Sequence, residues 1–272
     1  MIRTSTRLAL AFAVVLLASP LYAQDNDDAV LNVAQPDFTL VNLPTSLRLP
    51  TMRSAFRVTH RFVRPLKCDE CEDNLLEDLF GLDSGAAIGL EVRFGLIPGG
   101  QVVLHRARVD KTIQFLGEYG LTRQRDGMPV EIAALASIEG TDNFREEYSP
   151  TVGLIVTRLL GDRGTVHVEP MFIGNSNLFD VFTDDDSTFM VGLGSRIRVT
   201  PTVYLVGELT PRVAGYKPGT TLGSFGIEKR AGGHMFQLSV SNYFGTTLRQ
   251  IAQGALNGDQ WYLGFNISRK FF

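Results

Sequence analysis

The motif Cys68-Asp-Glu-Cys71 has a spacing typical of redox or metal chemistry. A haem attachment site would need a histidine directly after Cys71, and a closed zinc site would need two more thiolate or imidazole ligands nearby. A thioredoxin-like role would need a strand before the motif and a helix after it, which this stretch does not offer. We therefore predict a local disulfide in an oxidising compartment, with a redox-active or metal-docking pair as the less favoured alternative. No metal site is predicted.

The histidines offer little for catalysis. His167 and Glu169 lie two residues apart, so on a strand they share one face, and the carboxylate could orient the imidazole. No serine in a recognisable nucleophile context accompanies them, and the sequence contains neither Gly-x-Ser-x-Gly nor a phosphate-binding loop. A hydrogen-bonded structural histidine is the favoured interpretation. We expect no enzyme and no cofactor, and a membrane-barrel hydrolase is the weaker alternative.

Charged residues recur on one face of the predicted strands. If that face lines the interior of a barrel, the inward charges are Arg57, Arg61, Glu91, Arg93, Glu118, Glu131, Glu169, Arg196, Arg198, Glu208 and Arg212, together with His167. Two interpretations stay open: ion pairs that satisfy one another inside a narrow barrel, or the charged lining of a channel that selects small polar solutes. Arg196 and Arg198 lie near Glu208 and Arg212 on the next strand, so a surplus positive patch is expected there.

Twelve stretches have the length and alternation of strands. Most run for nine to twelve residues, which suits a tilted membrane crossing better than a soluble sheet. The predicted strands are 54–62, 88–96, 101–109, 111–122, 128–138, 150–160, 164–173, 188–200, 202–213, 221–230, 234–243 and 261–271. Alternation alone also fits a soluble β-sandwich.

The last strand is the most informative. From Trp261 to Phe271 apolar and polar residues alternate, with an aromatic residue at each end. Ten residues span roughly 33 Å, or about 25 Å when tilted, which is the height of the apolar band of an outer-membrane barrel. We predict Trp261 and Phe271 as membrane-interface anchors. A chain that ends in such a strand with Phe272 resembles substrates of the barrel-assembly machinery, which implies that machinery as a partner.

Connection lengths separate the barrel from the sandwich. The predicted links after even-numbered strands are short, as in 97–100, 161–164 and 231–233, whereas most links after odd-numbered strands are long: 63–87, 139–149, 174–187, 214–220 and 244–260. This asymmetry is typical of an up-and-down antiparallel transmembrane β-barrel. We therefore predict an all-β fold of this kind with about twelve strands.

The N-terminus resembles a secretory leader. Arg3 and Arg7 precede an apolar run that is too short to span a bilayer, and Ala23 precedes a polar stretch. We predict a signal peptide at 1–23, a periplasmic segment or plug at 24–53, and the barrel at 54–272. The remaining chain has a net charge of −5, which argues against nucleic acid as a partner.

Several segments together resemble a known family. They are Ser224 to Asn242, Gly264 to Arg269, Phe80-Gly-Leu-Asp83 and Val41 to Ser46. The resemblance is to an uncharacterised outer-membrane β-barrel family of Gram-negative bacteria, classed as a domain of unknown function. It covers most of the mature chain and implies a fold and a location, not an activity.

The sequence thus predicts a barrel in the outer membrane of a Gram-negative bacterium, exported by the Sec pathway, in contact with the lipid bilayer and lipopolysaccharide. The favoured function is a pore for passive or substrate-restricted passage of small polar solutes. The alternative is a structural or assembly barrel with a filled lumen that docks an unidentified protein partner through its long acidic loops or its N-terminal segment.

Overall fold

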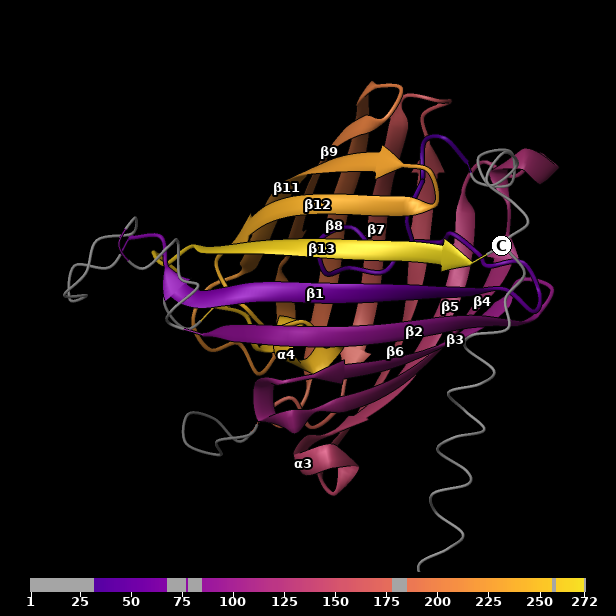
Figure 1. The fold of residues 1–272 in the computed structure, drawn as a ribbon. Helices are drawn as coiled ribbons and strands as arrows, with labels where there is room; N and C mark the ends of the chain where they lie inside the picture. Colours follow the sequence, from indigo (N-terminus) through magenta and orange to yellow (C-terminus); the bar gives the residue numbers. More distant parts are fainter. Residues whose placement is uncertain (1–31, 68–76, 78–84, 178–184, 256–257, 272) are drawn as a thin grey trace, which may run out of the picture.

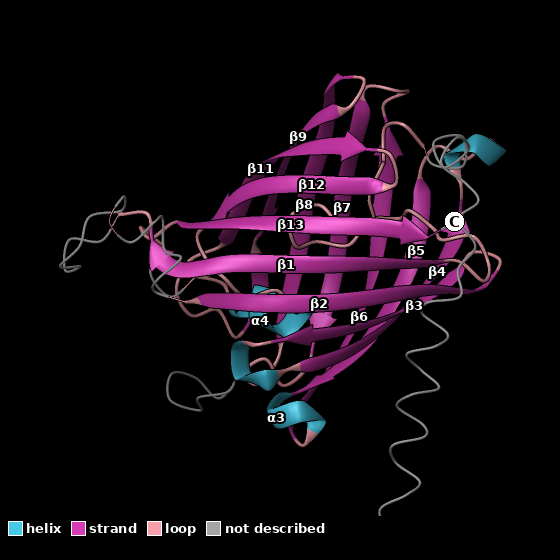
Figure 2. Ribbon diagram, viewed as in Figure 1, coloured by secondary structure: helices cyan, strands magenta, loops and turns pink. Residues whose placement is uncertain are grey.

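The computed structural model describes residues 32–67, 77, 85–177, 185–255 and 258–271. In this part of the chain the strands form one closed, antiparallel barrel of twelve crossings (Figures 1 and 2). Each crossing pairs with its neighbours in sequence, and the barrel closes where the first strand pairs with the last. The predicted signal peptide, Cys68, Cys71 and Phe272 lie outside the described residues.

The strands are β1 (Ser54–Pro65), β2 (Ala86–Ile97), β3 (Gly100–Ala107), β4 (Ile113–Thr122), β5 (Glu131–Gly140), β6 (Glu146–Leu159), β7 (Gly164–Ile173), β8 (Thr188–Thr200), β9 (Val203–Thr210), β10 (Arg212–Gly215), β11 (Leu222–Ala231), β12 (His234–Ser241) and β13 (Tyr262–Phe271). Two short helices, α3 (Thr141–Phe144) and α4 (Leu248–Gln253), lie in links. β9 and β10 both pair with β8 and form one crossing, interrupted at Pro211, which has no N–H to give to the ladder.

The predicted fold class is confirmed, and each of the twelve predicted crossings is present. β7 and β8 have the predicted bounds. One long link was predicted wrongly: the stretch 139–149 shrinks to residues 141–145, because β5 extends to Gly140 and β6 starts at Glu146. The link between β4 and β5 is longer than expected, because it contains a 3-10 turn at Gln124–Asp126.

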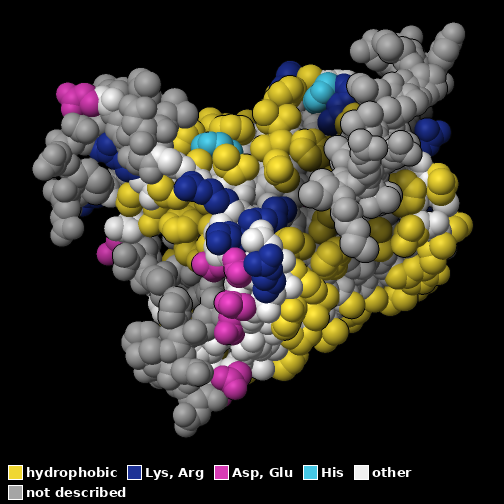
Figure 3. Space-filling model, turned by 60° about the horizontal axis from the view of Figure 1, so that its bottom comes forward, with side chains coloured by type: hydrophobic (Ala, Val, Ile, Leu, Met, Phe, Trp, Pro, Cys, Tyr) yellow, Lys and Arg dark blue, Asp and Glu magenta, His cyan; other side chains and the backbone are white. Residues whose placement is uncertain are grey.

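The barrel is apolar outside and polar inside, the reverse of a soluble protein. Outward side chains such as Leu90, Val92 and Phe225 are 46%, 48% and 59% exposed, and Figure 3 shows apolar surface over much of the wall. Inward positions carry buried arginine, glutamate, glutamine and threonine. A lipid environment favours this arrangement because it contacts apolar atoms, while hydrogen bonds within the ladder satisfy the backbone.

The two ends of the barrel differ. At the turn end, β8 and β9 are joined by residues 201–202, and β11 and β12 by residues 232–233. At the loop end, the links include residues 174–187 and 242–261, and α4 belongs to the second of these. No helix among the described residues is long and apolar enough to cross a membrane.

Candidate functional site

The interior of the barrel is occupied by residues 32–50, here termed the plug segment. It precedes β1 and passes into the barrel from the turn end (Figure 1). A tight turn reverses it: the Leu40 N–H donates to the Leu43 carbonyl at 2.8 Å, and the Thr45 N–H donates to the Phe38 carbonyl at 2.8 Å. Nearly every residue from 34 to 47 is buried. The segment therefore fills space that the polar wall encloses.

Glu208 on β9 holds the tip of the plug segment. Its carboxylate accepts the backbone N–H groups of Val41, Asn42 and Leu43 at 3.0 to 3.1 Å, and the Asn42 side-chain amide at 2.7 Å. Hydrogen bonds to a charged acceptor are about twice as strong as neutral ones. The turn at the tip makes this possible, because it points three successive N–H groups the same way.

Strands β1 and β13 bind the carbonyl of the same tip. The Val41 oxygen accepts from Arg57 Nη2 at 2.6 Å, from Asn266 Nδ2 at 3.2 Å and from Arg61 Nη2 at 3.3 Å. Arg61 also donates to the side-chain oxygens of Asn42 and Asn266, at 3.1 and 2.8 Å. The tip is therefore clamped between a carboxylate on β9 and two guanidinium groups on β1.

Further along the segment the contacts are again to backbone oxygens. Arg196 on β8 donates to the carbonyls of Asp37 and Thr39 at 3.3 and 2.6 Å, and Lys270 on β13 donates to that of Pro36. Arg196 also forms a buried ion pair with Glu228 on β11 at 2.7 Å. Glu228 therefore neutralises the charge of Arg196 inside the lumen.

Two glycines of β8 make room for the leucines of the tip. A Cβ atom at Gly194 would lie 2.1 Å from Leu40 Cδ1, and one at Gly192 would lie 2.9 Å from Leu43 Cδ1. Both distances are shorter than van der Waals contact. The wall therefore has slots for these leucines that any larger residue would close.

A second luminal network lies on β2 to β4. Arg93 forms ion pairs with Glu118 at 3.0 Å and Glu91 at 3.3 Å, and its guanidinium lies 5.1 Å from the Phe38 ring. Gln101 donates to the Leu47 carbonyl at 2.9 Å. These groups form structural ion pairs and also contact the plug segment.

Helix α4 fills the lumen from the loop end. All six of its residues are buried, and its N-terminus is held by Glu139 at the end of β5. That carboxylate accepts the Thr247 hydroxyl at 2.6 Å and the Arg249 N–H at 3.2 Å, and the Arg249 side chain lies 3.4 Å away. The helix therefore occupies part of the lumen at the loop end, and the plug segment occupies it at the turn end.

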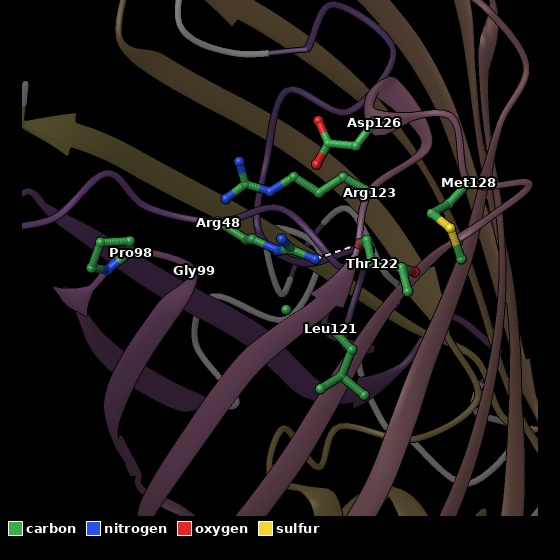
Figure 4. Close-up of a pocket in the computed structure, with 9 residues that line it drawn as sticks. Arg48, Pro98, Gly99, Leu121, Thr122, Arg123, Asp126 and Met128 are labelled. Carbon is green, nitrogen blue, oxygen red and sulfur yellow. Dashed lines mark hydrogen bonds between the residues drawn. The ribbon is translucent and has the colours of Figure 1, made fainter.

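A cavity of about 800 Å³ remains at the turn end, bordered by the plug segment and by the turns that follow β2, β4 and β6. It adjoins the smaller pocket of Figure 4, where Arg48 donates to the Thr122 carbonyl at 2.6 Å. Partial burial and the positive charge of Arg123 lower the pKa of Arg48. The cavity is polar and open, which is typical of a vestibule and not of an enclosed active site.

The structure places the predicted luminal residues as follows. Nine are buried: Arg57, Arg61, Glu91, Arg93, Glu118, His167, Glu169, Arg196 and Glu208. Three are partly exposed: Glu131 accepts the Ser46 hydroxyl, Arg198 donates to the Pro201 carbonyl at the turn end, and Arg212 donates to the Gln253 carbonyl beside α4. Of the interface anchors, Trp261 packs against Phe225 with ring centroids 5.9 Å apart, and Phe271 is 48% exposed.

His167 and Glu169 do not form the oriented pair that a catalytic site would need. Both ring nitrogens of His167 lie within hydrogen-bonding distance of threonine hydroxyls, Thr157 at 3.0 Å and Thr165 at 2.8 Å. Among the described residues, neither oxygen of Glu169 has a hydrogen-bond partner. The contacts of His167 are those of a structural histidine.

The sequence analysis missed several residues that hold the plug segment and α4. Glu228, Gln237, Asn266 and Lys270 follow the period of two along β11 to β13, so that pattern was sufficient to find them. Thr247 and Gln250 form a capping box, a sequence signal for the start of α4 within the predicted loop. No sequence pattern near Glu139 indicates that it binds the start of α4.

Comparison with known proteins agrees with this geometry. A family profile described as "Membrane bound beta barrel domain (DUF5777)" matches residues 37–271. The barrel is similar to the KdgM porin, solved in complex with disordered oligogalacturonate, and to the NanC porin. Each has a TM-score of 0.50 and 8% identity, and the match covers 81% of this chain and 99% of the porin.

A Rhodopseudomonas blastica porin variant aligns with a TM-score of 0.37 at 13% identity over 68% of this chain, which spans 55% of that porin. No curated protein matches by sequence. At 8% identity, the KdgM and NanC porins establish the fold alone.

Proposed function

Since this chain belongs to the membrane-bound β-barrel family DUF5777, we propose that it is an outer-membrane pore of a Gram-negative bacterium. The pore passes small polar solutes, and its own plug segment closes it in the observed state. The observation that carries this proposal is the way the lumen is filled: charged wall residues hold the plug segment chiefly by its backbone. A wall of this kind stays hydrophilic, and so can be wetted, when the segment leaves.

A permanent filler would be expected to be held by apolar packing alone, whereas the tip of the plug segment also depends on charged wall residues. Well-packed apolar residues often stabilise an interior as well as buried ion pairs do, or better. The plug segment is also not a strand of the wall: among the described residues, its one β-bridge joins Thr39 to Pro44 within the segment. Withdrawal of the segment would therefore leave the ladder between β1 and β13 intact.

We also propose how the protein reaches and contacts its membrane. The N-terminal leader would direct export by the Sec pathway, and the barrel-assembly machinery would recognise the last strand with Phe272. The wall would contact lipid and lipopolysaccharide. The protein would act as a channel and not as an enzyme, in keeping with the structural contacts of His167.

Proteoliposome swelling tests the pore. Residues 38–45 are replaced by a Gly/Ser linker of equal length, which removes the tip but keeps the connection to β1. Folding is checked by heat-modifiable gel mobility. The variant should admit small neutral sugars that the wild-type protein excludes or admits slowly. A folded variant that admits no sugar would refute the pore.

The second candidate is a structural barrel with a filled lumen that docks a protein partner. The observation in its favour is that both ends are filled, by the plug segment and by α4. On this view the linker variant stays impermeable, and removal of the tip changes stability alone.

A further inference from the structure

Two buried arginines bind the Val41 carbonyl, although a neutral oxygen requires no charged partner. Arg57 and Arg61 are 8% and 0% exposed, and both direct an N–H at one neutral oxygen. Among the described residues, neither guanidinium lies within ion-pair distance of a carboxylate, and the Nε of each has no hydrogen-bond partner. Buried cations without a counter-charge are costly.

The nearest acidic groups are already engaged. Glu91 lies opposite Arg57 across the β1–β2 pair, but its carboxylate bonds to Arg93 at 3.3 Å. Glu208 accepts the N–H groups of the tip, and Asp37 accepts the hydroxyl of Ser268 at 2.8 Å. The two arginines therefore keep unused donor capacity in the closed state.

We propose that Arg57, Arg61 and Asn266 form a binding site for the carboxylate group of a solute, and that the Val41 carbonyl occupies this site while the pore is closed. A carboxylate offers two charged oxygens where the carbonyl offers one neutral oxygen, and it matches the planar fork of a guanidinium. The wall also carries Glu208, which accepts N–H groups from the tip and can accept hydroxyl or N–H donors of a bound solute.

The consequence is competition between solute and plug segment. A carboxylate-bearing solute that binds where Val41 lies stabilises the displaced state, so it favours opening, whereas its neutral analogue does not. At a solute concentration ten times its dissociation constant, the displaced population should rise about tenfold. This inference deepens the proposed function by naming a class of solute.

Hydrogen–deuterium exchange of the full-length protein in detergent micelles tests the site without any transport step. The probes are D-glucuronate and D-glucose, which differ by the carboxylate, with equimolar potassium chloride as the ionic-strength control. We expect glucuronate to speed exchange of the amides of residues 41–43 about tenfold, and glucose and chloride to leave it unchanged.

Arg57→Gln with Arg61→Gln should abolish the difference between glucuronate and glucose. Lys229→Gln removes an exposed cation at the turn end, which is bonded to Thr202. This control variant should preserve the difference between the two sugars. Equal effects of the two sugars on the wild type, or a glucuronate response that persists in the double variant, would overturn the carboxylate site. Since neutral-sugar swelling tests the pore separately, either proposal can fail while the other stands.

Discussion

Replacement of Glu208 by glutamine should loosen the plug segment selectively. The carboxylate accepts three backbone N–H groups and the Asn42 amide, all at 2.7 to 3.1 Å. A hydrogen bond to a charged group contributes about 1.5–3 kcal/mol, and contributions from one cluster do not add. Glutamine keeps one neutral acceptor of similar volume. We therefore expect a loss of about 3 kcal/mol, which corresponds to roughly 150-fold in the ratio of displaced to docked segment.

Hydrogen–deuterium exchange measures this ratio directly, because protected amides exchange through the displaced state. In the Glu208→Gln variant the amides of residues 41–43 should lose about two orders of magnitude of protection. Those of β12, His234–Ser241, should keep theirs. A loss of less than tenfold at the tip would refute the clamp. A uniform loss over tip and strands would mean that Glu208 stabilises the barrel as a whole.

Two further substitutions, one with a matched control, separate the plug segment from α4. Gly194→Val should displace the plug segment, because the new Cβ would overlap Leu40 Cδ1 at 2.1 Å, and protease cleavage within the segment should become faster. Gly207→Val, where the nearest atom to a Cβ lies at 3.9 Å, should leave cleavage unchanged. Glu139→Gln should speed amide exchange in α4 without affecting the tip, because this carboxylate binds the start of the helix and makes no hydrogen bond to the plug segment among the described residues. Equally faster exchange in α4 and in the tip would show that the two segments are not held independently.

The sequence was sufficient to predict the wall. Lipid outside and polar groups inside force a period of two on every crossing, so the bounds of β7 and β8 could be read from apolar alternation. The break at Pro211 and the short link at 141–145 were missed, because a proline within a crossing and three left-handed residues in a tight turn leave no periodic signal. Short links are set by local backbone geometry.

The interior could not be predicted in the same way. The tip of the plug segment binds Glu208, more than 160 positions away, and the plug segment itself has no period that marks it as luminal. Its fit depends on Gly194, whose only contribution is the absence of a side chain. The pairing of Arg196 with Glu228 likewise joins strands that are not neighbours, so the charges on adjacent strands could not predict it.

Single-channel recording in a planar bilayer shows whether the plug segment closes a barrel that is able to conduct. The wild-type protein should be silent or open briefly, and the linker variant of residues 38–45 should show stable, reproducible steps of one size. The Glu208→Gln variant should show steps of the same size, with an open fraction greater than that of the wild type and smaller than that of the linker variant. A folded linker variant that remains silent would show that the lumen does not conduct, and would leave a filled barrel that serves to dock a partner.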